Sequence, residues 1–321
     1  MRVREPYKLP PEQREKQKRA EKLEWATLGF LVTIVVIMYL TMGGSQAMKT
    51  AWIEDMLGFI PPLVFLASLR FHKKAPNEHF PYGYRRANLL AFLCAATALF
   101  AMGLYLFYDA ATSLLSQEHP TIGTVTILSQ QIWLGWLMIA ALVYSAVPSL
   151  VLGRKKIPLA RELHEKVLYA DADMNKADWQ TAVAAIIGIL GIGLGWWWAD
   201  AAAAGLISLS IIYDGFTNLK RSLAALMDQR PTEVDGDDEA PIVAKLRDQL
   251  QSLDWVAEAD VRLREVGDVY SGEAYVVPHP HLNGDLVDKV REASRVADNC
   301  DWQIYDVVIM PVRSLRQEDI D

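Results

Sequence analysis

The sequence has little cysteine, and its histidines avoid the places where a buried metal site would need them. Only Cys94 and Cys300 occur in 321 residues, so neither a disulfide framework nor a cysteine-based metal site is expected. All six histidines fall outside the apolar runs: His72, His79, His119, His164, His279 and His281. Imidazole is the usual ligand for zinc. A membrane site without it favours harder ions such as manganese, iron(II) or magnesium.

Signatures of two other protein classes are also missing. There is no Gly-rich phosphate loop and no serine or cysteine nucleophile motif, so we do not expect an enzyme or a bound cofactor. Lysine and arginine gather in the N-terminal arm and in loops, while the region after about Asp228 has roughly twice as many acids as bases. Nucleic acid is therefore not an expected partner. The first 24 residues lack the short apolar core of a cleaved signal peptide.

Long apolar runs dominate the first two thirds of a chain that is 52% hydrophobic, which predicts an α-helical protein of the lipid bilayer. We predict six membrane spans, namely Trp25–Met42, Ala51–Leu69, Asn88–Leu115, Ile132–Leu152, a fifth from Asp171 to Leu194, and Ala199–Tyr213. The pair Pro61-Pro62 is expected to bend the second span close to Glu54 and Asp55.

The distribution of basic residues predicts the orientation. Loops 71–87 and 153–166 are rich in lysine and arginine, whereas the link from Ser116 to Gly123 has none. The positive-inside rule then places both termini in the cytoplasm. The location that we predict is the cell inner (plasma) membrane, with several membrane passes. We predict three regions: a basic cytoplasmic arm (1–24), a six-helix transmembrane domain (25–221) and a soluble cytoplasmic domain (222–321).

The soluble tail has alternating helix and strand patterns. Helical spacing over Pro241–Leu253 and Leu286–Ala297 and strand patterns over Trp255–Leu263, Glu273–Val277 and Trp302–Val312 give the order α-β-β-α-β. This order predicts a small sheet with helices on one face.

Carboxylates in and beside the apolar runs carry the functional hypothesis. Asp171 and Asp178 share one helix face with Met174 or Asn175, and Asp178 would lie roughly 18 Å into the membrane from Lys166 at about 1.5 Å per residue. Glu54 and Asp55 could approach them from the second span. Charge in a membrane is costly and usually persists because a charged ligand binds there. We therefore predict a divalent cation site made of oxygen donors, in which metal or protons balance the charge.

Each of these residues also has a plainer interpretation. A buried carboxylate can simply be hydrogen-bonded between helices, and a methionine such as Met174 more often packs than ligates a metal. Asp109 and Asp200 stand near outer helix ends, where a solvated or capping role is expected.

An ordered set of short motifs resembles the cation diffusion facilitator family over nearly the whole chain. The motifs are Pro81-Tyr82-Gly83 with Arg85-Arg86-Ala-Asn88, Tyr169-Ala-Asp171 with Asp178 and Thr181, and Leu226-Met-Asp228. The resemblance implies a homodimeric exporter of divalent metal, usually zinc, driven by proton antiport with alternating access. It also implies that the tail is a ferredoxin-like cytoplasmic domain that dimerises and, in many members, binds regulatory metal.

The resemblance also implies a ligand set. The family's transport site takes two residues four apart on the second helix and two four apart on the fifth, which correspond here to Glu54 and Gly58, and to Met174 and Asp178. Gly58 has no side chain to ligate with, so Asp171 or Asp55 could supply oxygens in its place. In the tail, Tyr275 and Met310 stand at about the places of the family's usual histidines.

Two hypotheses follow. The first is a dimeric metal/proton antiporter with an atypical, carboxylate-rich site (Glu54, Asp55, Asp171, Met174, Asp178) for zinc, manganese or iron(II). The second is a non-transporting membrane scaffold or sensor with the same fold and a degenerate metal site, which Gly58 and Met174 motivate.

Overall fold

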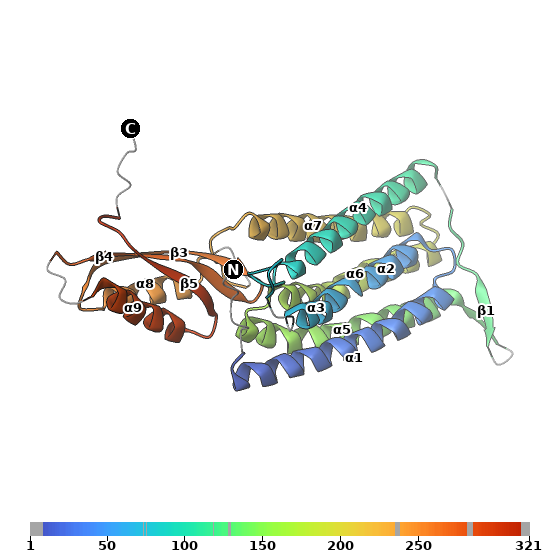
Figure 1. The fold of residues 1–321 in the computed structure, drawn as a ribbon. Helices are drawn as coiled ribbons and strands as arrows, with labels where there is room; N and C mark the ends of the chain where they lie inside the picture. The colour runs from blue at the N-terminus through green and yellow to red at the C-terminus, as the bar shows by residue number, and fades with distance from the viewer. Residues whose placement is uncertain are drawn as a thin grey trace.

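A computed structural model describes residues 9–72, 74, 76–117, 119–127, 130–234, 238–280 and 285–315. The chain forms an elongated bundle of helices with a smaller α/β region at one end and a β-hairpin at the other (Figure 1). Residues 1–8 of the predicted N-terminal arm, and His281, lie outside the described residues.

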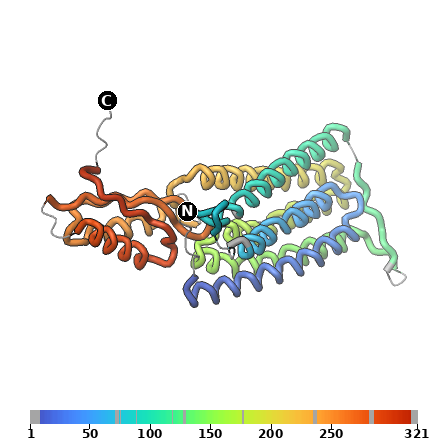
Figure 2. Tube along the Cα trace, in the orientation of Figure 1, coloured from blue at the N-terminus to red at the C-terminus, as the bar shows by residue number. Residues whose placement is uncertain are grey.

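Seven helices make up the described bundle. They are α1 (Pro11–Thr41), α2 (Gln46–Leu57), α3 (Ile60–His72), α4 (Ala87–Leu115), α5 (Leu134–Leu163), α6 (Lys166–Gly193) and α7 (Ala199–Leu226). In the tube view α4 lies along α7, while α1 and α5 run together on the other side (Figure 2). The helix α6 packs between α5 and α7. The first helix begins fourteen residues before the predicted Trp25, because the polar segment from Pro11 continues the same helix.

The predicted second span is two helices rather than one bent helix. The α2 helix ends at Leu57, and α3 starts at Ile60, so the break falls at Gly58 and Phe59. The two prolines expected to cause a bend instead occupy the first turn of α3, where a missing N–H costs nothing because that position has no helical acceptor. The break thus lies one turn beyond Glu54.

One loop prediction was wrong, and one hairpin was not predicted. The segment 153–163, predicted as part of a basic loop, is the last part of α5, which ends with His164 in a left-handed conformation. The segment that follows the predicted link Ser116–Gly123 contains a hairpin that was not predicted, with β1 (Thr124–Ile127) and β2 (Gln130–Trp133) paired antiparallel. The helix α5 accordingly begins at Leu134, two residues after the predicted Ile132.

Small residues hold the helices closely together. A Cβ at Gly215 of α7 would lie 2.6 Å from the backbone nitrogen of Phe100 on α4, and one at Gly191 of α6 would lie 2.3 Å from the Cβ of Ala199. Close backbone approach of this kind is the usual way in which membrane helices pack. The outward faces are apolar and exposed, as at Leu40, Leu115 and Tyr213, which suits contact with lipid.

Five described segments are long and apolar enough to cross a membrane: Pro11–Thr41, Gln46–Arg70, Leu89–Leu115, Leu134–Leu163 and Ala199–Leu226. The helix α6 is not among them, although its 28 residues lie alongside α5 and α7. The protein is therefore a helical membrane protein, and the sixth crossing stays a prediction.

At the end of the bundle that carries the β-hairpin, a buried carboxylate caps a helix. Asp200 of α7 accepts hydrogen bonds from the Ser45 hydroxyl (2.6 Å) and from the backbone N–H groups of Gln46 (2.5 Å) and Ala47 (3.3 Å). These N–H groups belong to the start of α2, where the helix dipole favours a negative group. The structure therefore confirms the capping role expected for Asp200.

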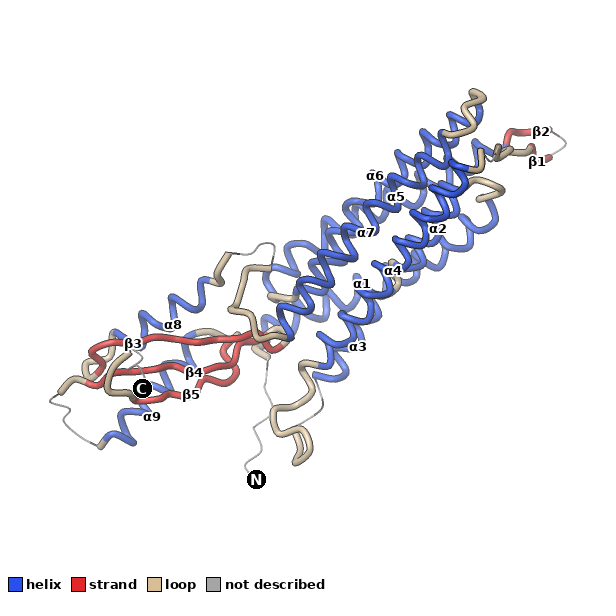
Figure 3. Tube along the Cα trace, turned by 90° about the horizontal axis from the view of Figure 1, so that it is seen from above, coloured by secondary structure: helices blue, strands red, loops and turns tan. Residues whose placement is uncertain are grey.

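The α/β region follows the predicted order. It contains α8 (Pro241–Gln251), β3 (Val256–Val266), β4 (Val269–Pro278), α9 (Leu286–Cys300) and β5 (Ile304–Pro311). The strands β3 and β4 pair antiparallel and β5 joins β4 in parallel, which requires the crossover through α9. The view from above shows the three strands extending away from the bundle, with α8 and α9 packed along the sheet (Figure 3). Its core includes Leu246, Leu250, Ala274 and Ala297.

The tip of the β3–β4 hairpin docks on the end of the bundle. Asp268 in the turn bonds to Arg85 (2.5 Å), and Glu265 bonds to Lys166 at the start of α6 (2.7 Å). The Tyr270 hydroxyl lies 2.5 Å from Nε2 of His164 at the end of α5. The hairpin therefore contacts the corner between α5 and α6 directly.

Candidate functional site

Two of the predicted carboxylates lie in the last turn of α2, beside the helix break. Glu54 and Asp55 are partly buried between helices. The Thr181 hydroxyl of α6 donates to Glu54 Oε1 at 3.3 Å, and the Ser145 hydroxyl of α5 donates to Asp55 Oδ1 at 3.2 Å. Both carboxylates therefore point toward neighbouring helices rather than toward lipid.

Asp178 of α6 approaches the same place. Its carboxylate lies near the buried Ser149 of α5 and interacts electrostatically with Glu54 and Asp55. The structure thus brings together three of the five residues predicted as ligands, contributed by α2 and α6. Three negative groups in a medium of low dielectric constant repel one another unless a cation or protons balance them.

A further carboxylate, Asp214 of α7, was missed by the sequence analysis. It is partly buried and interacts electrostatically with Glu54 and with Asp173 of α6. It was missed because the sixth span was predicted to stop at Tyr213, whereas α7 continues to Leu226. One signal in the sequence could have indicated Asp214: it directly follows the apolar run of the sixth span, and the helix continues beyond it.

The other two predicted ligands have different neighbours. The Met174 side chain is partly buried and packs against the main apolar core of the bundle. Asp171 is buried and bonds to the ammonium group of Lys156 (2.5 Å), and the Asn175 amide also donates to it (3.1 Å). Asp171 still interacts electrostatically with Asp178, one heptad further along α6.

Lys156 is the centre of a buried triad that joins three helices. Its side chain is fully buried on α5, and its Nζ lies 2.9 Å from Oε2 of Glu24 on α1, in addition to its bond with Asp171 on α6. Glu24 is also fully buried, and its second oxygen, Oε1, has no hydrogen-bond partner among the described residues. A basic residue predicted to lie in a loop is thus an internal counter-ion.

The described residues contain no group of three or more His, Cys, Asp or Glu side chains close enough to form a ready-made metal centre. Glu54, Asp55 and Asp178 therefore do not form such a group of three among the described residues.

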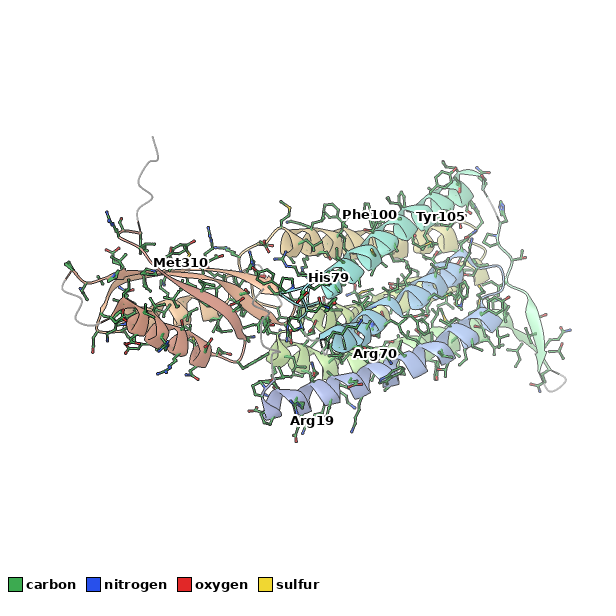
Figure 4. All side chains as sticks on the ribbon, in the orientation of Figure 1. Arg19, Arg70, His79, Phe100, Tyr105 and Met310 are labelled. Carbon is green, nitrogen blue, oxygen red and sulfur yellow. The ribbon has the colours of Figure 1, made fainter. Side chains whose placement is uncertain are left out.

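In the α/β region, Tyr275 of β4 and Met310 of β5 are directly paired neighbours. The Tyr275 ring stacks under the guanidinium of Arg262 (5.5 Å), and Met310 lies on the sheet (Figure 4). These side chains form a surface of one aromatic, one thioether and one cation.

Because Glu265 of β3 forms an ion pair with Lys166 at the end of the bundle, we expect the stability of the folded protein to depend on pH. Burial raises the pKa of Glu265, but the His164 imidazole 4.0 Å away, the Lys166 ammonium group and the hydrogen bond from the Thr232 N–H together outweigh burial and lower the pKa below its ordinary value of 4.5. A carboxylate with a lowered pKa stabilises the fold above its unfolded pKa, and this contribution is lost as the pH falls through the folded pKa. Glu265→Gln should therefore lower the melting temperature at pH 7 and have a smaller effect below about pH 4.5.

Thermal unfolding of the purified protein at several pH values would measure this difference. Glu258→Gln, at an exposed position of the same strand, is the control. A deficit of the Glu265→Gln variant that grows on acidification would contradict the interpretation.

The fold and the carboxylates between the helices are typical of helical membrane proteins that bind or transport ions. A family model described as the cation efflux transmembrane domain matches residues 25–227. The chain therefore belongs to the cation diffusion facilitator family, which is a family of transporters and not of enzymes.

Several curated proteins are similar to the chain. The cation-efflux pump FieF of Shewanella oneidensis is 27% identical over 290 residues, which cover 88% of this chain and 86% of FieF. The manganese efflux system protein MneS of Bacillus subtilis is 26% identical over 218 residues, covering 65% of this chain and 71% of MneS. A cadmium, cobalt and zinc/H(+)-K(+) antiporter of Bacillus velezensis is 25% identical over 221 residues, covering 65% and 64%.

Proposed function

We propose that the protein exports divalent metal cations across the membrane in exchange for protons. The observation that carries this proposal is the mutual electrostatic interaction of Glu54, Asp55 and Asp178 between α2 and α6. Membership of a cation efflux family supports the same conclusion. Asp214 of α7, which interacts with Glu54, is proposed as an additional oxygen donor.

Metal binding to carboxylates is linked to protons, because a protonated carboxyl is a poor ligand. On the cytoplasmic side, the deprotonated carboxylates would bind a metal ion and pull α2 toward α6. On the outer side, protons would compete for the same oxygens and release the ion. Alternating access of this kind needs a helix that can move, and the break at Gly58 supplies a hinge next to Glu54.

The donor set supports a hard or borderline ion. Carboxylate oxygens without imidazole or thiolate favour manganese or iron(II) over zinc. Among the relatives, MneS is named for manganese efflux and the antiporter of Bacillus velezensis for cadmium, cobalt and zinc. We propose manganese or iron(II) as the first substrates to test, with zinc as the comparison.

The architecture that we propose with this function is the following. The helix α6 is the sixth crossing, since its 28 residues would span about 42 Å at 1.5 Å per residue. The α/β region is a cytoplasmic domain of ferredoxin-like type, both termini are cytoplasmic, and the protein acts as a homodimer in the cell inner membrane. We place the domain boundaries at residues 24 and 221, between the N-terminal arm, the transmembrane domain and the cytoplasmic domain.

The experiment that tests the function is a flux panel. The purified protein in liposomes carrying a pH-sensitive dye is exposed to zinc, manganese, iron(II), cobalt, cadmium and magnesium in turn. We expect a saturable proton flux with manganese or iron(II) that disappears without the metal. Absence of metal-dependent flux with every ion would refute the transport proposal.

The second candidate is a scaffold or sensor that does not transport. The lack of a ready-made group of three ligands among the described residues, and glycine at position 58, favour it. Calorimetry separates the two functions, because a scaffold should show no saturable metal binding to the membrane domain. Binding in the micromolar range that is lost in Glu54→Ala would exclude the scaffold.

A further inference from the structure

Three arginines line one cavity where the bundle meets the α/β region. The cavity has a volume of about 300 Å³. Besides the arginines Arg85, Arg86 and Arg264, the residues that line it include Tyr82, Asp228 and Ser271. The lining residues come from the loop before α4, from the end of α7 and from the sheet. His79, in the same loop, marks this junction in the side-chain view (Figure 4).

The charges in this cavity are not balanced by its own carboxylate. Arg85 is matched by Asp268, which lies 2.5 Å away in the hairpin turn. Arg86 and Arg264 share Asp228, to which Arg86 makes a direct ion pair and Arg264 a longer contact of 3.6 Å. Two guanidinium groups therefore face the one carboxylate that lines the cavity.

One donor in the cavity is unused. The Nε atom of Arg264 is buried and has no hydrogen-bond partner among the described residues. Its strand neighbour across the β3–β4 pair is Ser271, whose side chain also lines the cavity and can donate an O–H. A buried N–H without an acceptor costs free energy, so a movement of the Arg264 side chain that brings this N–H to a bound oxygen anion would be favourable.

The surroundings of the cavity favour a ligand that comes from the membrane. Tyr82 is 72% exposed at its rim, and Met227, which follows α7, is 81% exposed. Exposed apolar residues continue from there along the outside of the bundle, as at Leu90 of α4 and Leu223 of α7. Aromatic and basic residues together at the end of membrane spans are typical of the level of the lipid headgroups.

We propose that this cavity binds the phosphate group of an anionic phospholipid, with its acyl chains along the outer face of α4 and α7. Guanidinium groups bind phosphate oxygens with paired, charge-assisted hydrogen bonds, and the Ser271 hydroxyl lines the same cavity. A lipid held here contacts the loop before α4, the end of α7 and the hairpin at once. It would fasten the α/β region to the membrane domain.

The test uses the full chain in detergent, titrated with short-chain phosphatidylglycerol, short-chain phosphatidylcholine and inorganic phosphate, with binding followed by thermophoresis. We expect saturable binding of phosphatidylglycerol that is about tenfold tighter than that of the zwitterionic lipid or of phosphate. Arg264→Gln should weaken it by about tenfold, because one charge-assisted contact is lost. Arg262→Gln, on the same strand but outside the cavity, should leave it unchanged.

Ser271→Asp is a second variant, which places a negative charge in the cavity and should also prevent binding. Circular dichroism and gel filtration check that both variants fold. Equal binding of the two lipids, or an equal loss in Arg262→Gln, would overturn the proposal. Phosphate binding as tight as that of phosphatidylglycerol would show that the cavity takes free phosphate, and this would overturn the assignment to a lipid.

Discussion

Replacement of Asp178 by alanine is expected to abolish metal-dependent proton flux in liposomes. Asp178 is the carboxylate of α6 that interacts with both Glu54 and Asp55 of α2, so it links the two helices that would enclose the ion. Without it, the remaining acids are Glu54 and Asp55 on one turn of α2 and Asp214 on α7, and α6 no longer contributes a carboxylate beside Glu54 and Asp55. Proton exchange would be lost with metal binding, because the same oxygens serve both.

The matched control for this prediction is Asp109→Ala. Asp109 is also an aspartate of a membrane helix, but its partner is Lys49 of α2 (3.0 Å) rather than a residue of α6. This variant should keep its flux. Asp178→Asn separates charge from shape, since it preserves side-chain size and should be as inactive as the alanine variant. Flux of wild-type size in Asp178→Asn would remove Asp178 from the proposed site.

Much of the fold could be predicted because each element has its own periodic pattern. The helix α4 begins one residue from its predicted start, and the α-β-β-α-β order of the tail is confirmed by the structure. Apolar run length and helix or strand period are local properties, and a single sequence displays them directly. The break at Gly58 was displaced from the prediction because prolines are as compatible with a helix start as with a bend.

The site was predicted less completely, because its partners come from distant parts of the chain. Glu54, Asp55 and Asp178 were found since a carboxylate in an apolar run is conspicuous. Lys156 was assigned to a loop because Arg154 and Lys155 precede it, although its burial depends on helices α1 and α6. One signal was available: Gly153, Lys156, Ala160 and Leu163 are all buried and follow helical spacing on one face of α5.

The triad around Lys156 gives the prediction with the largest expected effect on stability. Lys156→Met should lower the free energy of unfolding by roughly 3–5 kcal/mol, because it leaves Glu24 and Asp171 buried without their counter-ion. The melting temperature of the purified protein should fall by roughly 10 °C. Lys155→Met is the matched control, since Lys155 is the preceding residue and is exposed. It should melt like the wild type.

A second variant distinguishes loss of a counter-ion from loss of packing. If uncompensated charge is the cause, neutralising the acids as well, in Lys156→Met with Glu24→Gln and Asp171→Asn, should recover most of the stability. If lost packing around the lysine stem is the cause, the triple variant should be no more stable than Lys156→Met alone. Recovery of stability together with altered flux would mean that the triad also influences Asp178, because Asp171 interacts with that carboxylate along α6. Equal melting of Lys156→Met and Lys155→Met would contradict the role of Lys156 as an internal counter-ion.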